Sequence, residues 1–277
     1  MGAPDAAPLG LIAGNGRFPF LVAAAGRKAG RRVVAVAIKE ETDPALQGEV
    51  DEIHWVSLGQ LGRCIDALKS GGVREAVMAG QVKHRQIFSG IVPDLKMMGL
   101  LARLALKNTD SLIGAVADAL GREGIALLPS TALLQDQLAT PGAMTRGRPT
   151  PDEIKDVEYG REVARALAGF DIGQTVVVKD RAAVAVEAME GTDEAIHRAG
   201  RIAGPGCTVV KVAQPRQDVR FDVPVIGPGT VTAMREAQAR VLAVQTGGTL
   251  LLDRADLLAA ADRADVAVWG FEAPAAR

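Results

Sequence analysis

A stretch near residue 190 gathers groups that suit phosphate chemistry. In AVEAMEGTDEAI, Glu187 and Glu190 precede Gly191, and Thr192 is expected to cap a helix that runs from Asp193 onward. The free backbone N–H groups at the start of a helix attract anions. We therefore expect Glu190, Gly191 and Thr192 to contact a phosphate group of a ligand. An ordinary capped helix after a glycine turn explains the same residues without any ligand.

A second candidate lies downstream in RFDVPVIGPGT, where Asp222 stands among apolar residues. The run predicts an extended segment followed by a turn. Because side chains alternate along an extended segment, Arg220 is expected to point to the same face as Asp222. Asp222 offers a hard oxygen ligand, as do Glu190 and Asp193. The alternative is that Asp222 ends a strand or accepts hydrogen bonds within a turn.

Composition limits the classes of protein to consider. A chain of 277 residues favours two domains, and its hydrophobic fraction of 48% is enough for well-packed cores. The formal net charge of −1 gives no general attraction to nucleic acid. Cys64 and Cys207 lie far apart and have no metal-ligand spacing, so both are expected to be free thiols in a reducing cytoplasm. We expect a soluble protein, because no apolar run is long enough to span a membrane.

The amino-terminal half predicts a mostly parallel sheet. Apolar runs at 9–13, 32–38, 52–58 and 74–80 alternate with helical stretches, which is typical of βαβ units. The first strand is followed by Gly14, Asn15 and Gly16, and a turn at this place is a good contact point for a phosphate or sugar. The turn lacks the third glycine of the dinucleotide fingerprint, which argues against a nicotinamide cofactor.

Further candidates follow the fourth expected strand. The segment QVKHRQ offers Gln81 and a basic triplet that begins at Lys83, which is either part of a crevice or a solvated loop. Two helices are expected next, broken near 108–109. Asp110 then lies in the first turn of the second helix, as a neighbour of the capping residue or as a polar group aimed at the crevice. The first helix carries an apolar stripe that suits a core better than a lipid groove, formed by Met97, Leu100, Leu101 and Leu104.

A cluster of Pro and Gly near residue 140 marks the domain boundary, which gives domains 1–139 and 140–277. In the second domain, Thr150 and Pro151 begin a helix that runs to about residue 168. A hairpin over 171–188, a strand at 207–213 and a helix at about 231–240 follow. The pattern predicts a Rossmann-like α/β domain with a parallel sheet, followed by a mixed α+β domain.

Long ordered motifs resemble one family over nearly the whole chain. The runs DIGQTVVVKDRAAVAVEAMEGTDEAIHRAG and KVAQPRQDVRFDVPVIGPGTV look like the carboxyl-terminal domain of LpxI, the UDP-2,3-diacylglucosamine diphosphatase of lipid A biosynthesis. LIAGNGRFP, AGQVKHRQIFS and NTDSLIGAVADALGREGI look like its first domain, in the same order. One departure is Gln214, which stands where the family pattern has a lysine, so a phosphate contact from that position is in doubt.

The resemblance implies hydrolysis assisted by Mg²⁺ or another divalent cation. Water would attack the α-phosphorus of UDP-2,3-diacylglucosamine and release UMP and 2,3-diacylglucosamine 1-phosphate, known as lipid X. Asp222 matches the aspartate that the family requires and is assigned to the metal or to the attacking water, with Asp193 as a second metal ligand. Arg220 is assigned to catalysis, either on the diphosphate or as the partner that keeps Asp222 ionised. The expected substrate-binding residues are Gly14, Asn15, Gly16, Gln81, Lys83, Asp110, Gln174, Glu190, Gly191 and Thr192.

The residues themselves are compatible with this chemistry. The sequence contains no Walker loop and no recognisable Ser or Cys nucleophile beside a His and an acid, so direct attack by water is favoured. The resemblance also implies a homodimer, a substrate held between the domains, and a cytoplasmic protein that contacts the inner leaflet of the inner membrane. The leading alternative is a non-catalytic protein that binds a sugar nucleotide or lipid phosphate.

Overall fold

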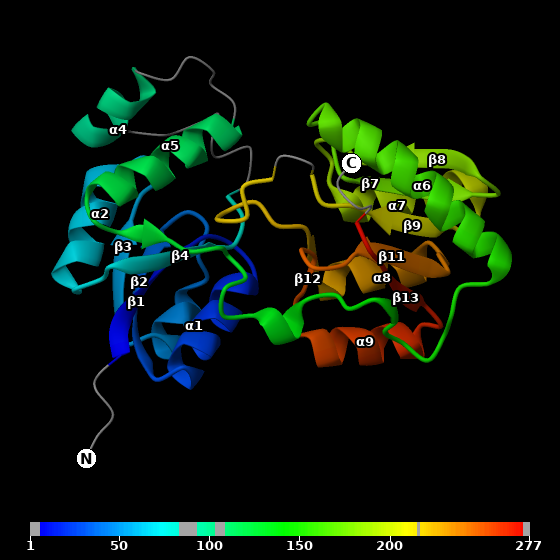
Figure 1. Ribbon diagram of the computed structural model, residues 1–277, viewed down its shortest axis with the longest axis horizontal. Coiled ribbons are helices and arrows are strands. Elements are labelled where there is room, and N and C mark those ends of the chain that lie inside the picture. Colours follow the sequence, from blue (N-terminus) through cyan, green and yellow to red (C-terminus); the bar gives the residue numbers. More distant parts are fainter. Residues whose placement is uncertain (1–5, 83–92, 103–108, 215–216, 274–277) are drawn as a thin grey trace. The chain divides into compact units, whose positions relative to one another are not determined.

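The computed structural model describes residues 6–82, 93–102, 109–214 and 217–273 (Figure 1). Residues group into two compact units. The first unit contains Met1–Leu134 together with Asp218–Asp222, and the second contains Gln135–Gln217 and Val223–Arg277. A short segment from late in the sequence therefore belongs to the first unit. Both cysteines are buried free thiols, as predicted.

The first unit is built on a five-stranded sheet in the order β3-β2-β1-β4-β5. Every described pairing in it is parallel, and the order is that of doubly wound nucleotide-binding folds. This confirms the predicted Rossmann-like α/β domain. The strands are β1 (Ala6–Ala13), β2 (Arg31–Ile38), β3 (Glu52–Val56), β4 (Glu75–Ala79) and β5 (Ala126–Leu127).

Helices cover both faces of this sheet, which explains why its strands are continuous apolar runs. On one face, Gly26 of α1 packs so closely on Leu9 and Val33 that an added Cβ would lie 2.9 Å from both side chains. On the other face, Val34 and Val36 pack with side chains of α2, α4 and α5 in one core cluster. The helices of this unit are α1 (Phe18–Lys28), η1 (Pro44–Glu49), α2 (Leu61–Ser70), α4 (Leu95–Leu101) and α5 (Thr109–Arg122).

The second unit has a six-stranded mixed sheet in the order β6-β13-β11-β9-β7-β8. The three central strands β9, β11 and β13 are parallel, while β6 and β7 run antiparallel to their neighbours. This confirms the predicted mixed α+β domain and its hairpin. The strands are β6 (Gly142–Ala143), β7 (Thr175–Lys179), β8 (Ala182–Val186), β9 (Thr208–Lys211), β11 (Val241–Gln245) and β13 (Ala267–Phe271), with β10 (Val225–Ile226) and β12 (Leu250–Leu251) forming a separate parallel pair.

Helix α6 (Pro151–Gly169) packs on one face of the mixed sheet (Figure 1). It begins where the sequence predicts, because the Thr150 hydroxyl and the Glu153 carboxylate form a reciprocal capping box with the backbone. The opposite face carries α7 (Thr192–Ala203), α8 (Pro228–Glu236) and α9 (Arg254–Arg263). A single-turn helix, η2 (Gln135–Gln137), lies at the start of this unit.

Some expected elements differ from those observed. The helix predicted at 231–240 is α8, which starts earlier because Gly227 is extended and Pro228 occupies its first turn. It ends at Glu236, since Gln238 adopts a φ of 52°. Thr192 is the first residue of α7 rather than its cap, a position that Gly191 takes with a φ of 87°. The extended segment expected around Asp222 is a turn over 219–221, and only Val225–Ile226 forms a strand.

Candidate functional site

The loops after β1 and β4 meet at the point where the strand order reverses. The Asn15 amide donates to the carbonyl of Gln81 at 2.8 Å, and the Gln81 amide donates back to Asn15 at 3.1 Å. An added Cβ at Gly80 would lie 2.6 Å from the Asn15 carbonyl oxygen, so glycine is needed for this approach. The Gly14 amide donates to the Ala79 carbonyl at 2.9 Å. These amides are therefore engaged by backbone carbonyls, unlike those of a phosphate-cradling turn.

Two side chains at this crevice contact each other. The Asn15 side-chain amide donates to the buried Glu41 carboxylate at 3.3 Å. Glu41 is fixed by its place in the turn after β2, where the Thr42 hydroxyl donates to the Ala13 carbonyl at 2.7 Å. Gly16 has a φ of 91° and no atom within 4 Å of the position of a Cβ. Gly14, Asn15, Gly16 and Gln81 thus lie together at the carboxyl ends of β1 and β4, and their contacts with substrate stay predictions.

An apolar pocket of about 360 Å³ opens beside this crevice within the first unit. Its wall includes Met97 and Leu101 of α4, which belong to the stripe expected to be core; Leu100 packs against the core, and Leu104 lies outside the described residues. Burial, with a contribution from Asp94, raises the pKa of the Cys64 thiol in the wall to about 12, so this thiol is uncharged at neutral pH. Other apolar lining comes from Ile12, Phe18, Val36, Ile38, Val56, Met78, Leu112, Ile113 and Val116.

Asp222 and Phe221 line the same pocket, although the sequence places them in the second half of the chain. The turn that carries them is closed by hydrogen bonds from the amides of Phe221 and Asp222 to the Asp218 carbonyl, at 3.1 and 2.9 Å. A pocket that is apolar inside and has a half-buried carboxylate among its lining suits a ligand with an apolar tail and a polar head.

Arg220 pairs with Asp218, which corrects the expectation that it points to the same face as Asp222 along an extended segment. Its guanidinium donates to both carboxylate oxygens of Asp218, with Nε at 2.9 Å from Oδ1 and Nη2 at 2.6 Å from Oδ2. The Asp218 carboxylate also accepts the Arg220 amide at 3.1 Å, and this bond favours a turn over a strand. The hydrogen bonds from Arg220 hold the pKa of Asp218 below its usual range and raise that of Arg220, so both groups are charged at neutral pH.

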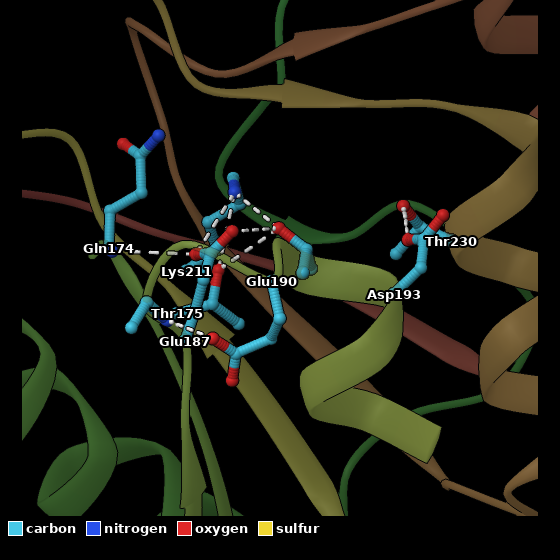
Figure 2. A network of polar contacts seen from close by, with 9 residues as sticks. Gln174, Thr175, Glu187, Glu190, Asp193, Lys211 and Thr230 are labelled. Carbon is cyan, nitrogen blue, oxygen red and sulfur yellow. Dashed lines mark hydrogen bonds and ion pairs between the residues drawn. The ribbon is translucent and has the colours of Figure 1, made fainter. Parts of the chain in front are cut away.

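A buried polar network occupies the carboxyl edge of the second unit's sheet (Figure 2). Lys211 ends β9 with a side chain only 4% exposed, and its ammonium donates to the hydroxyls of Thr175 and Thr192 at 3.2 and 2.8 Å. The carboxylate of Glu187 lies 3.7 Å from the ammonium and accepts the Thr192 hydroxyl at 2.7 Å. We call Thr175, Glu187, Thr192 and Lys211 the lysine network.

The lysine network keeps Glu187 ionised. Burial opposes ionisation of this carboxyl, but the Lys211 charge and the hydrogen bonds of Thr175, Thr192 and Gln174 outweigh it, so the pKa lies below its ordinary value. A buried charge without such a partner would be strongly destabilising. The lysine network therefore ties the DIGQT, EGTD and TVVK segments together by charge compensation.

The DIGQ motif contacts the lysine network through its backbone. An added Cβ at Gly173 would lie 2.1 Å from the Glu187 carbonyl oxygen, so only glycine fits there. The Gln174 amide donates to the Glu187 carboxylate at 3.4 Å. The side-chain oxygen Oε1 of Gln174 is buried and has no hydrogen-bond partner among the described residues. Gln214, at the position of the missing lysine, donates to Asp171 at 3.2 Å.

The remaining acids of the EGTD stretch have structural partners. Glu190 accepts the Ala188 amide at 3.1 Å and forms an ion pair with Arg198 at 2.6 Å. Asp193 accepts the Thr230 hydroxyl at 2.8 Å, which links α7 to the first turn of α8 (Figure 2). The expected contacts of Glu190, Gly191 and Thr192 with a ligand stay predictions. Lys83 lies outside the described residues, and of Asp110 only its place in the first turn of α5 is described.

Asp222 and Asp193 could each supply a single ligand to a divalent cation, but neither belongs to a cluster of potential ligands among the described residues. Over the described ranges, no three His, Cys, Asp or Glu side chains gather as a metal site would require. Mg²⁺ is commonly held by only one or two carboxylates together with waters and substrate phosphates, so Asp222 in the pocket wall satisfies this need. Asp193 belongs to the second unit and already accepts a hydrogen bond.

Sequence reasoning missed Lys211, Thr175, Glu41 and Ser130. A charged residue that ends the apolar run TVVK was a usable signal for Lys211, because a lysine at the end of a buried strand requires a partner. Ser130 gave no such signal, since its hydroxyl contacts the carbonyl of Arg220, which lies 90 positions further along the chain.

Comparisons with known proteins match nearly the whole chain. The model of the LpxI N-terminal domain matches residues 8–137, and the model of the LpxI C-terminal domain matches residues 140–269. The chain is also 30% identical to a curated protein of Caulobacter vibrioides, the UDP-2,3-diacylglucosamine pyrophosphatase LpxI, over 275 residues that cover 95% of this chain and 97% of the relative.

Two solved structures show a weak likeness to this chain. Pyruvate carboxylase of Rhizobium etli has 16% identity and a TM-score of 0.29, with 72% of this chain and 15% of that chain covered. The biotin carboxylase domain of Hydrogenobacter thermophilus 2-oxoglutarate carboxylase has 15% identity and a TM-score of 0.26, with 70% and 41% covered. Scores this low do not establish a shared fold.

The lysine network predicts that breaking its ion pair destabilises the second unit. Lys211→Met should lower the free energy of unfolding by about 3 kcal/mol, because Glu187 is left as an uncompensated buried charge. The double variant Lys211→Met with Glu187→Gln should recover part of this loss. The control Lys155→Met removes an exposed ion pair with Asp152 and should change stability by less than about 1 kcal/mol. Denaturant unfolding measures all three, and equal losses for Lys211→Met and the control would contradict the prediction.

Proposed function

Because the chain belongs to the LpxI family, we propose that it hydrolyses UDP-2,3-diacylglucosamine to UMP and 2,3-diacylglucosamine 1-phosphate. The observation that carries this proposal is the 30% identity to the Caulobacter vibrioides pyrophosphatase over almost the full length of both chains. The family membership agrees with the resemblance found in the sequence motifs. The apolar pocket, with Asp222 in its wall, is the part of the structure that fits such an amphipathic substrate.

In this proposal the pocket receives acyl carbon. Its volume lies within the usual range of ligand pockets, and its lining is predominantly apolar with few polar groups. The diphosphate of the substrate is polar and must stay outside such a lining, close to the polar groups of the wall. The acyl chains would thus determine where the diphosphate lies relative to Asp222.

Asp222 acts on water in this proposal, because a carboxylate repels the negative charge of a diphosphate. An ionised carboxylate can accept a proton from a water molecule that attacks phosphorus. Arg220 is held by Asp218, and its Nη1 lies 4.0 Å from Asp118, so we assign it mainly to keeping this turn closed.

We also propose that the reaction uses Mg²⁺ or another divalent cation, which Asp222 in the pocket wall would hold. When bound, such a cation neutralises charge on the diphosphate oxygens. A separate prediction, drawn from the resemblance, is that water attacks the α-phosphorus. Hydrolysis in oxygen-18 water tests it, since attack at the α-phosphorus places the label in UMP and attack at the β-phosphorus places it in the sugar phosphate.

The same chemistry would bring the protein to a membrane surface, because its proposed substrate carries acyl chains. Over the described residues, no helix combines the length and the apolar character needed to cross a bilayer. Helix α4 presents two faces: Met97 and Leu101 line the pocket, while Leu95 is 87% exposed and Met98 is 53% exposed. We propose that Leu95 and Met98 insert into the cytoplasmic leaflet of the inner membrane next to the pocket.

A homodimer is a further proposal from the family resemblance. The second unit exposes the large apolar side chains of Phe170 and Met189, which a partner copy would cover favourably. Light scattering of the purified protein measures its mass, and a monomer at micromolar concentration would contradict the proposal.

Asp222→Asn should abolish most turnover, because the amide cannot accept a proton from water. We expect UMP release to fall roughly 100-fold or more, a typical effect for loss of a general base, with little change in KM. The control Asp66→Asn removes an exposed carboxylate of α2 in the same unit and should keep full activity. A chelator should also stop the wild-type reaction. If the wild type binds the substrate but releases no UMP with any divalent cation, the non-catalytic binder becomes the better account.

Filling the pocket should weaken binding of long acyl chains. Ile113 lines the pocket and is only partly buried, so Ile113→Trp adds bulk there at little cost to the core. KM for the long-chain substrate should rise roughly tenfold, the effect of losing about 1.4 kcal/mol of binding, while a short-chain analogue should be little affected. Ile202→Trp, at an exposed position of α7, is the matched control. Equal effects on both substrates would show that the acyl chains lie elsewhere.

Replacing the exposed apolar side chains of α4 should weaken membrane binding. Leu95→Ser with Met98→Ser removes apolar area that would otherwise leave water, so co-sedimentation with phospholipid vesicles should fall roughly tenfold or more. Ile202→Ser is the control for an exposed apolar residue outside α4. Unchanged sedimentation of the double variant would rule out α4 as the membrane contact.

A further inference from the structure

Ser130 connects the end of the parallel sheet to the turn that carries Asp222. It follows β5 and is 2% exposed. Its amide donates to the Val219 carbonyl at 2.9 Å. Its hydroxyl oxygen lies 2.8 Å from the Arg220 carbonyl oxygen and 2.9 Å from that of Met78 in β4. A serine hydroxyl has one proton to donate, so these two carbonyls share it.

These bonds explain why the turn belongs to the first unit. Ser130 and Arg220 are 90 positions apart in the sequence, and Asp218–Asp222 is separated from the rest of the first unit by most of the second. Within the turn, the ion pair of Asp218 and Arg220 and the amide bonds to the Asp218 carbonyl fix the backbone up to Asp222. The position of the Asp222 carboxylate relative to the pocket wall therefore depends on the attachment at Ser130.

We infer that Ser130 is a positioning residue for Asp222: its amide and hydroxyl hold the 218–222 turn against β4, whose Met78 lines the pocket. This role requires no contact of Ser130 with the substrate or with the reacting water. Its effect on turnover rests on the proposed function of Asp222, whereas its effect on the turn does not. Small displacements of a reacting group cost large factors in rate.

Ser130→Ala tests this inference, because it removes the hydroxyl and keeps the amide. Amide hydrogen exchange in the peptide that covers 217–224 should become faster, while the exchange of β1, β2 and β4 stays unchanged. The kcat for UMP release should fall roughly tenfold or more, and KM should change little because the apolar pocket is intact. Ser70→Ala removes an unrelated hydroxyl from the same unit, bonded to Ala67, and should change neither exchange in the turn nor kcat.

A second variant protects the test against a general loss of stability in Ser130→Ala. Asp218→Asn weakens the ion pair with Arg220 at a partly exposed position, so it should loosen the same turn and lower kcat without affecting the sheet. The inference is overturned if turn exchange is unchanged in both variants, if kcat is unchanged in both, or if exchange rises equally throughout the first unit in both. A wild-type protein that releases no UMP would refute the proposed function, and turn exchange would still decide whether Ser130 holds the turn.

Discussion

The hydrogen bonds from Ser130 to the backbone of Val219 and Arg220 bring together parts of the site that the sequence keeps far apart. They place a carboxylate from the second half of the chain in the wall of a pocket formed by the first half. Among the described residues that line the pocket, Asp222 is the only Asp, Glu, Lys, Arg or His. With Asp222 the pocket combines a place for acyl carbon with a group able to act on water, which is what hydrolysis of a lipid-linked diphosphate requires.

Charge compensation has the corresponding role in the second unit. The ammonium of Lys211 is almost fully buried, so the chain must supply Glu187 and two threonine hydroxyls around it. This requirement fixes the end of β9, the end of β8 and the start of α7 relative to one another. The family motifs DIGQ and EGTD are thus explained in part by stability, through Gly173, Glu187 and Thr192, before any contact with a ligand is considered.

Local patterns predicted the fold well and the site only in part. Alternating apolar runs gave the parallel sheet, and Thr150 with Pro151 gave the start of α6, because periodicity and capping act within a few residues. The turn at Asp218–Asp222 was predicted as an extended segment, since the carboxylate that bends it and the serine that anchors it are not visible in a local pattern. For the same reason Arg220 was paired with Asp222 rather than Asp218. Thr192 is not the helix cap that we expected, because Lys211 of β9 and Glu187, which follows β8, use its hydroxyl.

The account depends most on the location of the acyl chains in the first unit's pocket, next to Asp222. The most direct measurement is photocrosslinking with a UDP-2,3-diacylglucosamine analogue that carries a diazirine in one acyl chain, followed by mass spectrometry and competition with unlabelled substrate. The account predicts competed crosslinks to α4, α5 and the peptide that contains Met78, all of which line the pocket. Competed crosslinks confined to peptides of the second unit, within 140–214 or 223–273, would contradict it.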